Sequence, residues 1–467
     1  MVTSDAYREL GEAAWSWVLN QVREDKGPWL PETVAEDDQE EDRDRDREDG
    51  QDDGQDDGRN TVPAKDRDTL YAGIAGLAPV LAEIGQYREL SGRERTLATG
   101  IVTRLSSEAN GRTEPSLYSG LAGDAMALKL LAPGKESIAL RRLADLATPE
   151  GWKTTVEFEP GSDAPLNDII MGTAGVVLTA VWAGGECAEA IATTGSEALL
   201  RVADRTEAGL DWGIAPGTQW RAPNYSHGTA GVAAALAVAG AALHREDFVE
   251  AAVKGAQHVL SVGSLEDDGF VVPHTIPPSK REVEPVTYTW CHGPAGTSHL
   301  FTALSHAGVA EVAGLDVGGL RHRCLTSILT SGVPERLRPG FWDNDGRCCG
   351  TAGVGDVLLD AAQDCENRED CEATARAEAL LQAARRMGDA LVERAVTDET
   401  GARWRFLEHR KDPPILPPGT AWMQGAAGIA AYLLRLARFI ETGPDAPVVD
   451  RPDQWWAVPA HLRSTAS

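Results

Sequence analysis

The sequence predicts an all-α fold, an α/α toroid (a closed barrel) of seven inner and seven outer helices. Three observations carry this prediction: a glycine motif that recurs seven times along 467 residues, an Ala- and Leu-rich run after each copy, and a second helical run before the next copy. Self-similarity at this length is typical of a repeat architecture and lets a long chain form one body.

The glycine motif is G-x-x-G with Ala in the third place. The first glycines of successive copies are separated by 47, 52, 56, 65, 57 and 75 residues, and the copies occupy residues 73–76, 120–123, 172–175, 228–231, 293–296, 350–353 and 425–428. These spacings suit one helical hairpin per copy. Glycine at the start of each inner helix relieves crowding where helix ends converge, and it permits a positive φ at the turn.

The runs between the motifs favour helices. After the fourth copy, residues 232–244 read VAAALAVAGAALH, and residues 245–262, REDFVEAAVKGAQHVLSV, precede the next copy. Their length and composition are typical of helices rather than strands. An open stack of hairpins needs polar end repeats. Residues 426–439 after the last motif, AAGIAAYLLRLARF, are as apolar as the middle runs, which favours closure into a ring.

Composition divides the chain into four predicted parts. They are an N-terminal helical segment (1–34), an acidic disordered insert (35–62), the toroid (63–445) and a C-terminal tail (446–467). Within the insert, residues 36–58 hold 14 acidic and 3 basic residues and almost nothing apolar. Such a segment buries too little surface to offset the entropy of ordering it.

Charge and targeting signals narrow the class of protein. The net charge of −28 argues against nucleic acid and anionic membranes as partners. The N-terminus carries charges throughout and lacks the apolar region of a signal peptide, and we expect no membrane span. An odd number of cysteines, seven, in a chain without an export signal predicts reduced thiols in the cytoplasm, used for metal binding or catalysis.

The residues just before four consecutive glycine motifs carry the chemistry. In order along the chain they are Asp168, His227, Cys291 and the adjacent pair Cys348 and Cys349. Copies one, two and seven offer no comparable group. If the motifs share one mouth of a ring, an acid, an imidazole and three thiols gather there.

Three thiols at one rim predict a zinc site. Cys291, Cys348 and Cys349 supply three protein ligands and leave a fourth position for substrate, which is the pattern of catalytic rather than structural zinc. Sulfur ligands also disfavour magnesium and calcium. The alternative is that these are small buried thiols. His292, next to Cys291, is an alternative ligand to Cys349.

The other cysteines match no ligand pattern. We interpret them as structural or incidental; they are Cys187, Cys324, Cys365 and Cys371.

Through all seven motifs, over about residues 65–440, the chain resembles the lanthionine synthetase C family of lanthipeptide cyclases, which has glutathione-handling relatives. The resemblance implies an α/α toroid with a central Zn²⁺. It also implies a reaction in which a cysteine thiol of a dehydrated precursor peptide adds to dehydroalanine or dehydrobutyrine, forming a thioether ring.

The resemblance assigns roles residue by residue. The cysteine of the W-C-x-G motif falls on Cys291, and the C-H-G pair falls on Cys348 and Cys349, so that cysteine replaces the histidine ligand. The H-G histidine falls on His227, and the aspartate before the third motif falls on Asp168.

One family residue has no counterpart. The arginine expected shortly before W-C-x-G is absent, because Thr287 lies four residues before Cys291. The nearest upstream arginine is Arg281, and the sequence leaves its role open.

Two residues are predicted to be catalytic. We assign His227 as the general acid that protonates the α-carbon after thiol addition, and Asp168 as the group that orients it or takes up the thiol proton. A histidine satisfied by backbone groups is the alternative for His227. A helix cap is the alternative for Asp168.

Three functions remain open from the sequence. The leading one is a zinc-dependent cyclase that receives a dehydrated peptide from a separate dehydratase. The second is addition of glutathione to dehydrated proteins at the same site. The third is a non-catalytic zinc-containing scaffold of a lanthipeptide synthetase complex.

Overall fold

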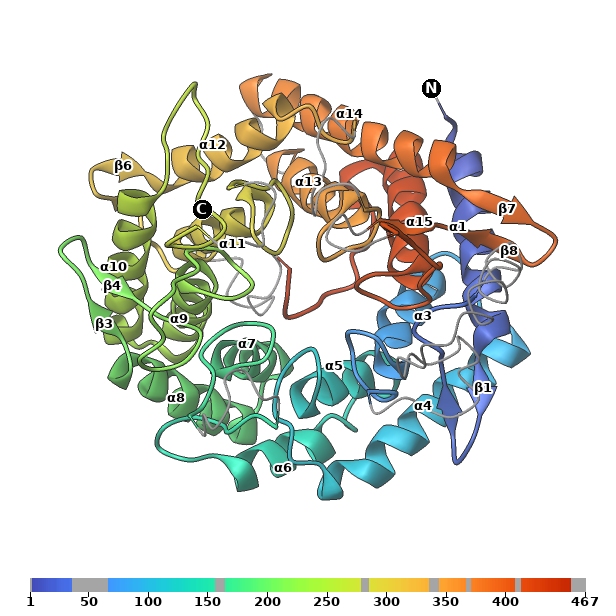
Figure 1. The fold of residues 1–467 in the computed structure, drawn as a ribbon, viewed down its shortest axis with the longest axis horizontal. Coiled ribbons are helices and arrows are strands. Elements are labelled where there is room, and N and C mark those ends of the chain that lie inside the picture. The colour runs from blue at the N-terminus through green and yellow to red at the C-terminus, as the bar shows by residue number, and fades with distance from the viewer. Residues whose placement is uncertain are drawn as a thin grey trace, which may run out of the picture.

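Seven helices surround the centre of the molecule and seven more surround them (Figure 1). This computed structural model describes residues 2–35, 66–155, 164–278, 285–335, 344–366, 371–407 and 413–454. The acidic insert, from residue 36 on, and the tail beyond residue 454 lie outside the described residues. Within the described residues, the predicted all-α toroid of seven inner and seven outer helices is confirmed.

Each inner helix begins at or just after a glycine motif. The inner helices are α3 (Leu77–Gly85), α5 (Leu121–Leu131), α7 (Thr173–Ala183), α9 (Thr229–Leu243), α11 (Pro294–His306), α13 (Thr351–Glu366) and α15 (Ala426–Thr442). The outer helices are α4 (Gly92–Glu108), α6 (Ser137–Leu146), α8 (Glu186–Arg201), α10 (Glu246–Val262), α12 (Val317–Thr330), α14 (Cys371–Arg394) and α1 (Ser4–Gln21).

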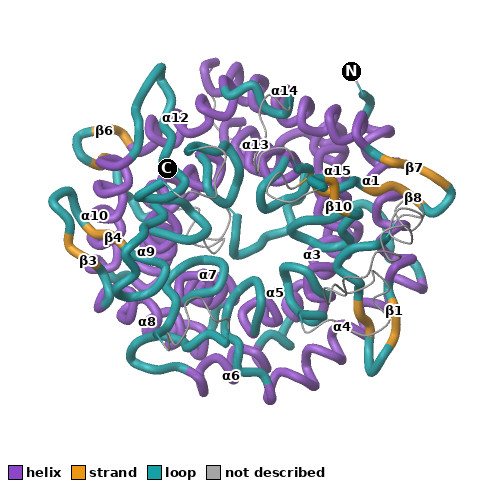
Figure 2. The backbone as a smooth tube through the Cα atoms, viewed as in Figure 1, coloured by secondary structure: helices purple, strands orange, loops and turns teal. Residues whose placement is uncertain are grey.

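Short elements occupy the connections. Figure 2 shows the strands as small orange segments, most of them at the periphery and β10 beside α15. They form antiparallel pairs: β1 (Arg23–Glu24) with β2 (Pro28–Trp29), β3 (Asp204–Arg205) with β4 (Leu210–Asp211), β5 (Glu311–Val312) with β6 (Leu315–Asp316), β7 (Val396–Asp398) with β8 (Gly401–Arg403), and β9 (Phe406–Leu407) with β10 (Ile415–Leu416). The 3₁₀ helices are η2 (Ile74–Gly76), η3 (Ala109–Gly111) and η5 (Gly443–Asp445).

Composition separates the two rings. In α9 every residue from Thr229 to Gly240 is buried, so this helix has no solvent face and consists almost entirely of Ala, Val, Leu and Gly. In α10 the buried residues recur at helical intervals on one side, which is the pattern of a helix packed on a core with its other face in water. The hydrophobic core therefore lies between the rings and within the inner one.

The N-terminal helix completes the outer ring. Helix α1 packs against α15 and supplies the outer partner of the last repeat (Figure 1). The indole nitrogen of Trp15 donates to Glu94 of α4 at 2.7 Å, and the Tyr7 hydroxyl donates to Asp389 of α14. The first helix and the last inner helix thus pack together as one pair, which closes the toroid.

A circle of backbone hydrogen bonds joins the turns before the inner helices. In each turn, a backbone amide shortly before the first glycine of the motif donates to a carbonyl of the next turn. The donor lies two residues before that glycine in six turns and three residues before it in the third turn, at Ile169. The seven bonds run Tyr71–Tyr118, Tyr118–Ile170, Ile169–Ser226, Ser226–Cys291, Cys291–Cys348, Cys348–Met423 and Met423–Tyr71, at 2.8–3.3 Å. This circle holds all seven turns at one mouth of the ring.

The glycines of the motif are required by close approach. A Cβ on Gly353 would lie 1.8 Å from the carbonyl oxygen of Arg347, and a Cβ on Gly231 would lie 1.9 Å from that of Tyr225. The first glycine of each motif has an extended backbone, as at Gly228 with a φ of −160°. The expected crowding is therefore confirmed, whereas the expected positive φ at these turns is wrong.

The chain after α15 turns back into the ring. Residues 443–454, red in Figure 1, cross the centre, although the sequence places residues from 446 on in a tail. Arg451 is 1 % exposed and Asp453 is buried as well. The C-terminal segment thus occupies part of the hollow of the toroid.

Candidate metal centre

Three cysteine sulfurs meet at the mouth formed by the turns. Cys291 precedes α11, and Cys348 and Cys349 precede α13, so two neighbouring repeats supply them. The Sγ atoms of Cys291 and Cys349 are 3.2 Å apart, those of Cys348 and Cys349 are 3.4 Å apart, and all three lie within 4.8 Å of one another. The amide of Cys291 donates to the carbonyl of Cys348, which fixes the register of the two turns.

This sulfur group fits zinc. Three sulfurs at about 2.3 Å from a tetrahedral zinc ion lie about 3.8 Å apart, within the range that these cysteines span. All three are buried free thiols. Each also precedes the N-terminal end of an inner helix, where the helix dipole stabilises thiolates. An all-sulfur set selects zinc over calcium and magnesium.

The thiols differ in acidity. Hydrogen bonds from Cys291 and Cys349 lower the pKa of Cys348 well below its usual value. Burial raises the pKa of Cys291, and hydrogen bonds to the other two cysteines raise that of Cys349.

The predicted catalytic pair is in contact. The Nδ1 of His227, in the turn before α9, lies 2.7 Å from Oδ2 of Asp168, in the turn before α7. Asp168 is fully buried, whereas the side chain of His227 is 26 % exposed. The other oxygen of Asp168 accepts from the amide of Met171 at 2.9 Å, so the carboxylate both supports its own turn and orients the imidazole.

The charge state of His227 follows from this pair. Burial disfavours the charged imidazole, but the hydrogen bond and charge of Asp168, together with the charge on Cys348, raise the pKa of His227 above its usual value. A histidine held in this way is protonated more readily than an isolated one. The protonated imidazole is the form that a general acid requires.

Histidine 292 lies against the sulfur group without joining it. Its Nδ1 is 2.9 Å from Sγ of Cys291, and its ring centroid lies 3.8 Å from that of His274 and 5.5 Å from that of His227. The cluster whose ligand atoms all lie within 4.8 Å of one another consists of the three cysteines and does not include His292. The alternative in which His292 replaces Cys349 is therefore not favoured.

The structure adds residues to the site that the sequence did not suggest. Tyr71 hydrogen-bonds Cys348, and Nε2 of Gln424 lies 3.8 Å from Sγ of Cys349 and 3.0 Å from the Tyr71 hydroxyl. They belong to copies one and seven, which offer no acid, imidazole or thiol at these positions but do place neutral polar side chains beside the cysteines. Tyr71 lies two residues before the first glycine of its motif, as Cys348 does, and Gln424 lies one residue before it, as Cys349 does. This equivalence of position is the sequence signal that could have identified them.

Within the described part of the chain, the remaining cysteines and Thr287 do not belong to the cysteine cluster. Cys187 is exposed, and Cys324 is buried in α12. Arg281 lies outside the described residues, as do the side chains of Cys365 and Cys371. Thr287 is buried, and its hydroxyl lies 3.5 Å from that of Thr289.

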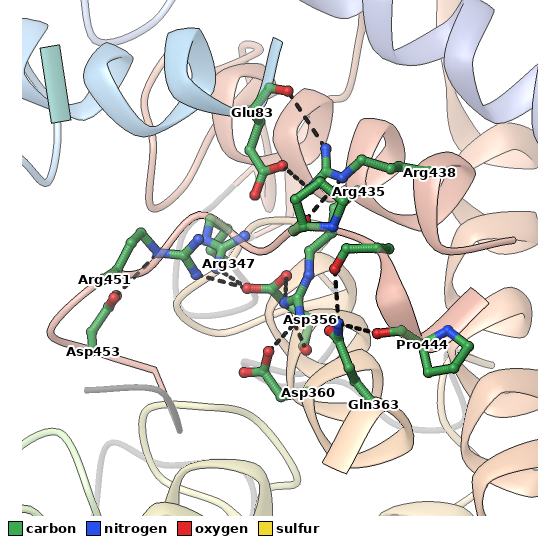
Figure 3. A network of polar contacts seen from close by, with 12 residues as sticks. Glu83, Arg347, Asp356, Asp360, Gln363, Arg435, Arg438, Pro444, Arg451 and Asp453 are labelled. Atoms are coloured by element: carbon green, nitrogen blue, oxygen red, sulfur yellow. Dashed lines mark hydrogen bonds and ion pairs between the residues drawn. The ribbon is translucent and has the colours of Figure 1, made fainter. Parts of the chain in front are cut away.

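Figure 3 shows a buried ion network that includes Arg347. Arg347, directly before Cys348, pairs with Asp356 of α13. Asp356 also accepts from Arg435 of α15 at 2.7 Å and from Arg451 of the C-terminal segment at 2.8 Å. Although burial opposes ionisation, the three arginines hold the pKa of Asp356 well below its usual value. The turn that carries two cysteines is thereby tied to the last inner helix and to the C-terminal segment.

Comparisons with known proteins agree with this architecture. The family model described as lanthionine synthetase C-like protein matches residues 64–441. Among solved structures, nisin cyclase is similar with a TM-score of 0.53 and 15 % identity, over 85 % of this chain and 92 % of that one. An unsaturated glucuronyl hydrolase from Bacillus sp. GL1 has a TM-score of 0.42 and 13 % identity, over 94 % and 97 % of the two chains. No curated protein sequence matches.

Proposed function

This chain belongs to the lanthionine synthetase C-like family, and from that premise we propose that it is a zinc-dependent lanthipeptide cyclase. It adds cysteine thiols of a dehydrated precursor peptide to dehydroalanine or dehydrobutyrine, forming lanthionine and methyllanthionine rings. The observation that carries the proposal is the meeting of three sulfurs from two repeats within 4.8 Å of one another, near a His–Asp pair.

The cofactor is held by this chain's thiols. Cys291, Cys348 and Cys349 are the residues that bind zinc in this proposal. When bound, the ion supplies the Lewis acidity that keeps a substrate thiol deprotonated at neutral pH, where a free thiol is mostly protonated.

The catalytic pair completes the addition. The substrate sulfur forms a bond to the β-carbon of the dehydroamino acid, and the electrons of the double bond move to the neighbouring carbonyl as an enolate. His227 then gives its proton to the α-carbon, which collapses the enolate to the thioether product. Asp168 holds the imidazole through Nδ1, so Nε2 is the nitrogen that transfers this proton. The proton lost by the substrate thiol returns the imidazole to its charged form.

The substrate peptide comes from a partner. Within this proposal a separate dehydratase supplies the dehydrated peptide. Since the reaction needs three reduced thiols, we place the protein in a reducing compartment, the cytoplasm. None of the helices in the described ranges is long and apolar enough to cross a membrane.

One assay separates this function from its alternatives. A dehydrated peptide is incubated with the protein, with and without glutathione, and free thiols are counted by alkylation and mass spectrometry. Loss of peptide thiols without a mass change supports cyclisation, whereas a mass gain of glutathione supports the second function. If the product pattern is unchanged by the double substitution His227→Ala and Cys348→Ala, the protein is a scaffold and the proposal is wrong.

A further inference from the structure

Each sulfur of the cluster has its own hydrogen-bond donor. Cys291 is contacted within its own turn, by the Thr289 hydroxyl at 3.3 Å and by His292. Cys348 and Cys349 are contacted instead by Tyr71 and Gln424. These two residues come from the first and the last repeat, so two of the three sulfurs depend on side chains from outside the turns that carry them.

Tyr71 and Gln424 form a pair across the closure of the ring. The amide of Met423 donates to the carbonyl of Tyr71 at 3.3 Å, and Nε2 of Gln424 donates to the Tyr71 hydroxyl at 3.0 Å. Because the phenol oxygen accepts this bond, its hydrogen is free to point at Cys348. The same amide group also lies 3.8 Å from Cys349, which is within reach of a hydrogen bond to sulfur.

These contacts matter because the cluster is highly anionic. Three thiolates around one Zn²⁺ carry a net charge of −1, and a fourth thiolate from a substrate makes it −2. Neutral donors spread this charge without competing for the metal, and such partners of metal ligands typically change metal affinity by about 10–100-fold.

We propose that Tyr71 and Gln424 are positioning residues of the metal centre. By donating hydrogen bonds to the sulfurs of Cys348 and Cys349, they hold the two thiolates as ligands and moderate their charge. The centre is then complete only when the first and last repeats meet. This inference rests on the proposed function, because it assumes that the cysteine cluster binds a metal.

The second repeat offers a matched control. Tyr118 occupies the same place before its glycine motif as Tyr71, and the two rings lie edge to face with centroids 6.2 Å apart. The hydroxyl of Tyr118, however, donates to Asp453 at 2.7 Å rather than to a sulfur. Removing either hydroxyl costs a buried hydrogen bond, but only Tyr71→Phe removes one from the cluster.

The test uses cobalt(II) alone as the probe, bound to the purified full-length protein. The thiolate-to-cobalt charge-transfer band reports the electron density on the sulfurs, and competition with a chelator gives the zinc affinity. We expect Tyr71→Phe to move the band to longer wavelength and to lower zinc affinity about tenfold. Tyr118→Phe leaves both at the wild-type values.

A second variant keeps the inference testable if Tyr71→Phe does not fold. Gln424→Leu removes the donor to Cys349 and the support of the Tyr71 hydroxyl, so it also moves the band to longer wavelength. An unchanged band in the folded variants, or an equal shift in Tyr118→Phe, overturns the inference while leaving the proposed function intact. A wild-type protein that binds neither cobalt nor zinc overturns both.

Discussion

At the scale of single residues, Cys349 sets the charge of the proposed metal centre. The family resemblance predicts a histidine ligand there, and the structure instead brings a third sulfur to within 3.2 Å of Cys291. A thiolate donates more charge to zinc than a neutral imidazole does. It should therefore weaken the hold of the metal on a substrate sulfur and leave that sulfur more nucleophilic.

The first prediction follows from this charge. Cys349→His should retain zinc, measured by elemental analysis, but slow cyclisation of a dehydrated peptide about tenfold, which corresponds to ~1.4 kcal/mol in the barrier. Single-turnover kinetics isolates the chemical step from peptide release. Faster turnover in the variant would reject the proposed effect of the third thiolate.

The second prediction concerns the charge of His227. Asp168 raises the pKa of His227, so the imidazole remains a proton donor up to a higher pH than an isolated histidine. Asp168→Asn removes this charge and lowers the pKa. The alkaline limb of kcat/KM should then move to lower pH, with a larger loss of rate at pH 8 than at pH 6.

The pH profile of a variant with its zinc content verified is the appropriate measurement. If Asp168→Asn lowers the rate equally at every pH, Asp168 acts on something other than the protonation of His227. The same pair also favours the folded state while His227 is charged. That contribution is present below the usual pKa of histidine and fades as the pH rises through the raised value.

The sequence located the residues of the candidate site better than the side chains that hydrogen-bond them. Equivalent positions before the glycine motifs brought together Cys291, Cys348 and Cys349, because each repeat presents the same turn to one mouth. The sequence did not indicate Tyr71 and Gln424, because a tyrosine or a glutamine before a glycine is not typical of a metal site. Only the closure of the ring places them beside the sulfurs.

At the scale of the elements, the glycine turns decide where the cysteines lie. A Cβ on Gly353 would lie 1.8 Å from the carbonyl oxygen of Arg347, the residue directly before Cys348. The turn cannot relieve this contact without moving both cysteines. Steric closeness, not backbone handedness, therefore makes this position glycine.

The third prediction tests this turn. Gly353→Ala should lower the free energy of unfolding in urea by about 3–5 kcal/mol, the upper range for single substitutions. It should also weaken metal binding. Gly85→Ala at the end of α3 is the control, because a Cβ there meets nothing within 4 Å, and we expect it to be neutral. Equal stability of the two variants would contradict the role of close approach.

Helices were predictable because their apolar runs are long and bounded by glycine. The outer partner of α15 could not be predicted, because α1 lies more than four hundred residues earlier in the chain. The sequence of α1 indicates only an isolated amphipathic helix. Amphipathicity indicates that a helix has a buried face but not which helix covers it. The contacts of Trp15 and Tyr7 with α4 and α14 supply that information.

At the scale of the whole molecule, a network of buried ion pairs lies inside the toroid, next to the apolar core. Arg451 enters from the C-terminal segment and pairs with Asp356 at 2.8 Å and with Asp453 at 3.3 Å. Its sequence context, which is polar and rich in proline, resembles a tail and gives no sign of burial. The segment is ordered by ion pairs that exist only inside a closed ring.

The fourth prediction tests this network. Arg451→Met keeps the volume but leaves Asp356 and Asp453 with less compensation, and should cost about 3–5 kcal/mol in the free energy of unfolding. Arg245→Met is the control, because its pairs with Asp247 and Glu197 are partly exposed. Exposed pairs contribute about 0–1 kcal/mol. The free energies of unfolding are measured by urea denaturation. Similar losses in both variants would show that the buried pairs of Arg451 stabilise the fold no more than exposed pairs do.

The most direct test of the proposed chemistry is zinc K-edge X-ray absorption on the purified protein, before and after addition of a dehydrated peptide with free cysteines. Three sulfur ligands at about 2.3 Å and one lighter atom are expected for the protein alone, and four sulfurs once the peptide is bound. Fewer than three sulfurs in the free protein, or a ligand set that does not change with peptide, would contradict thiol activation at Cys291, Cys348 and Cys349.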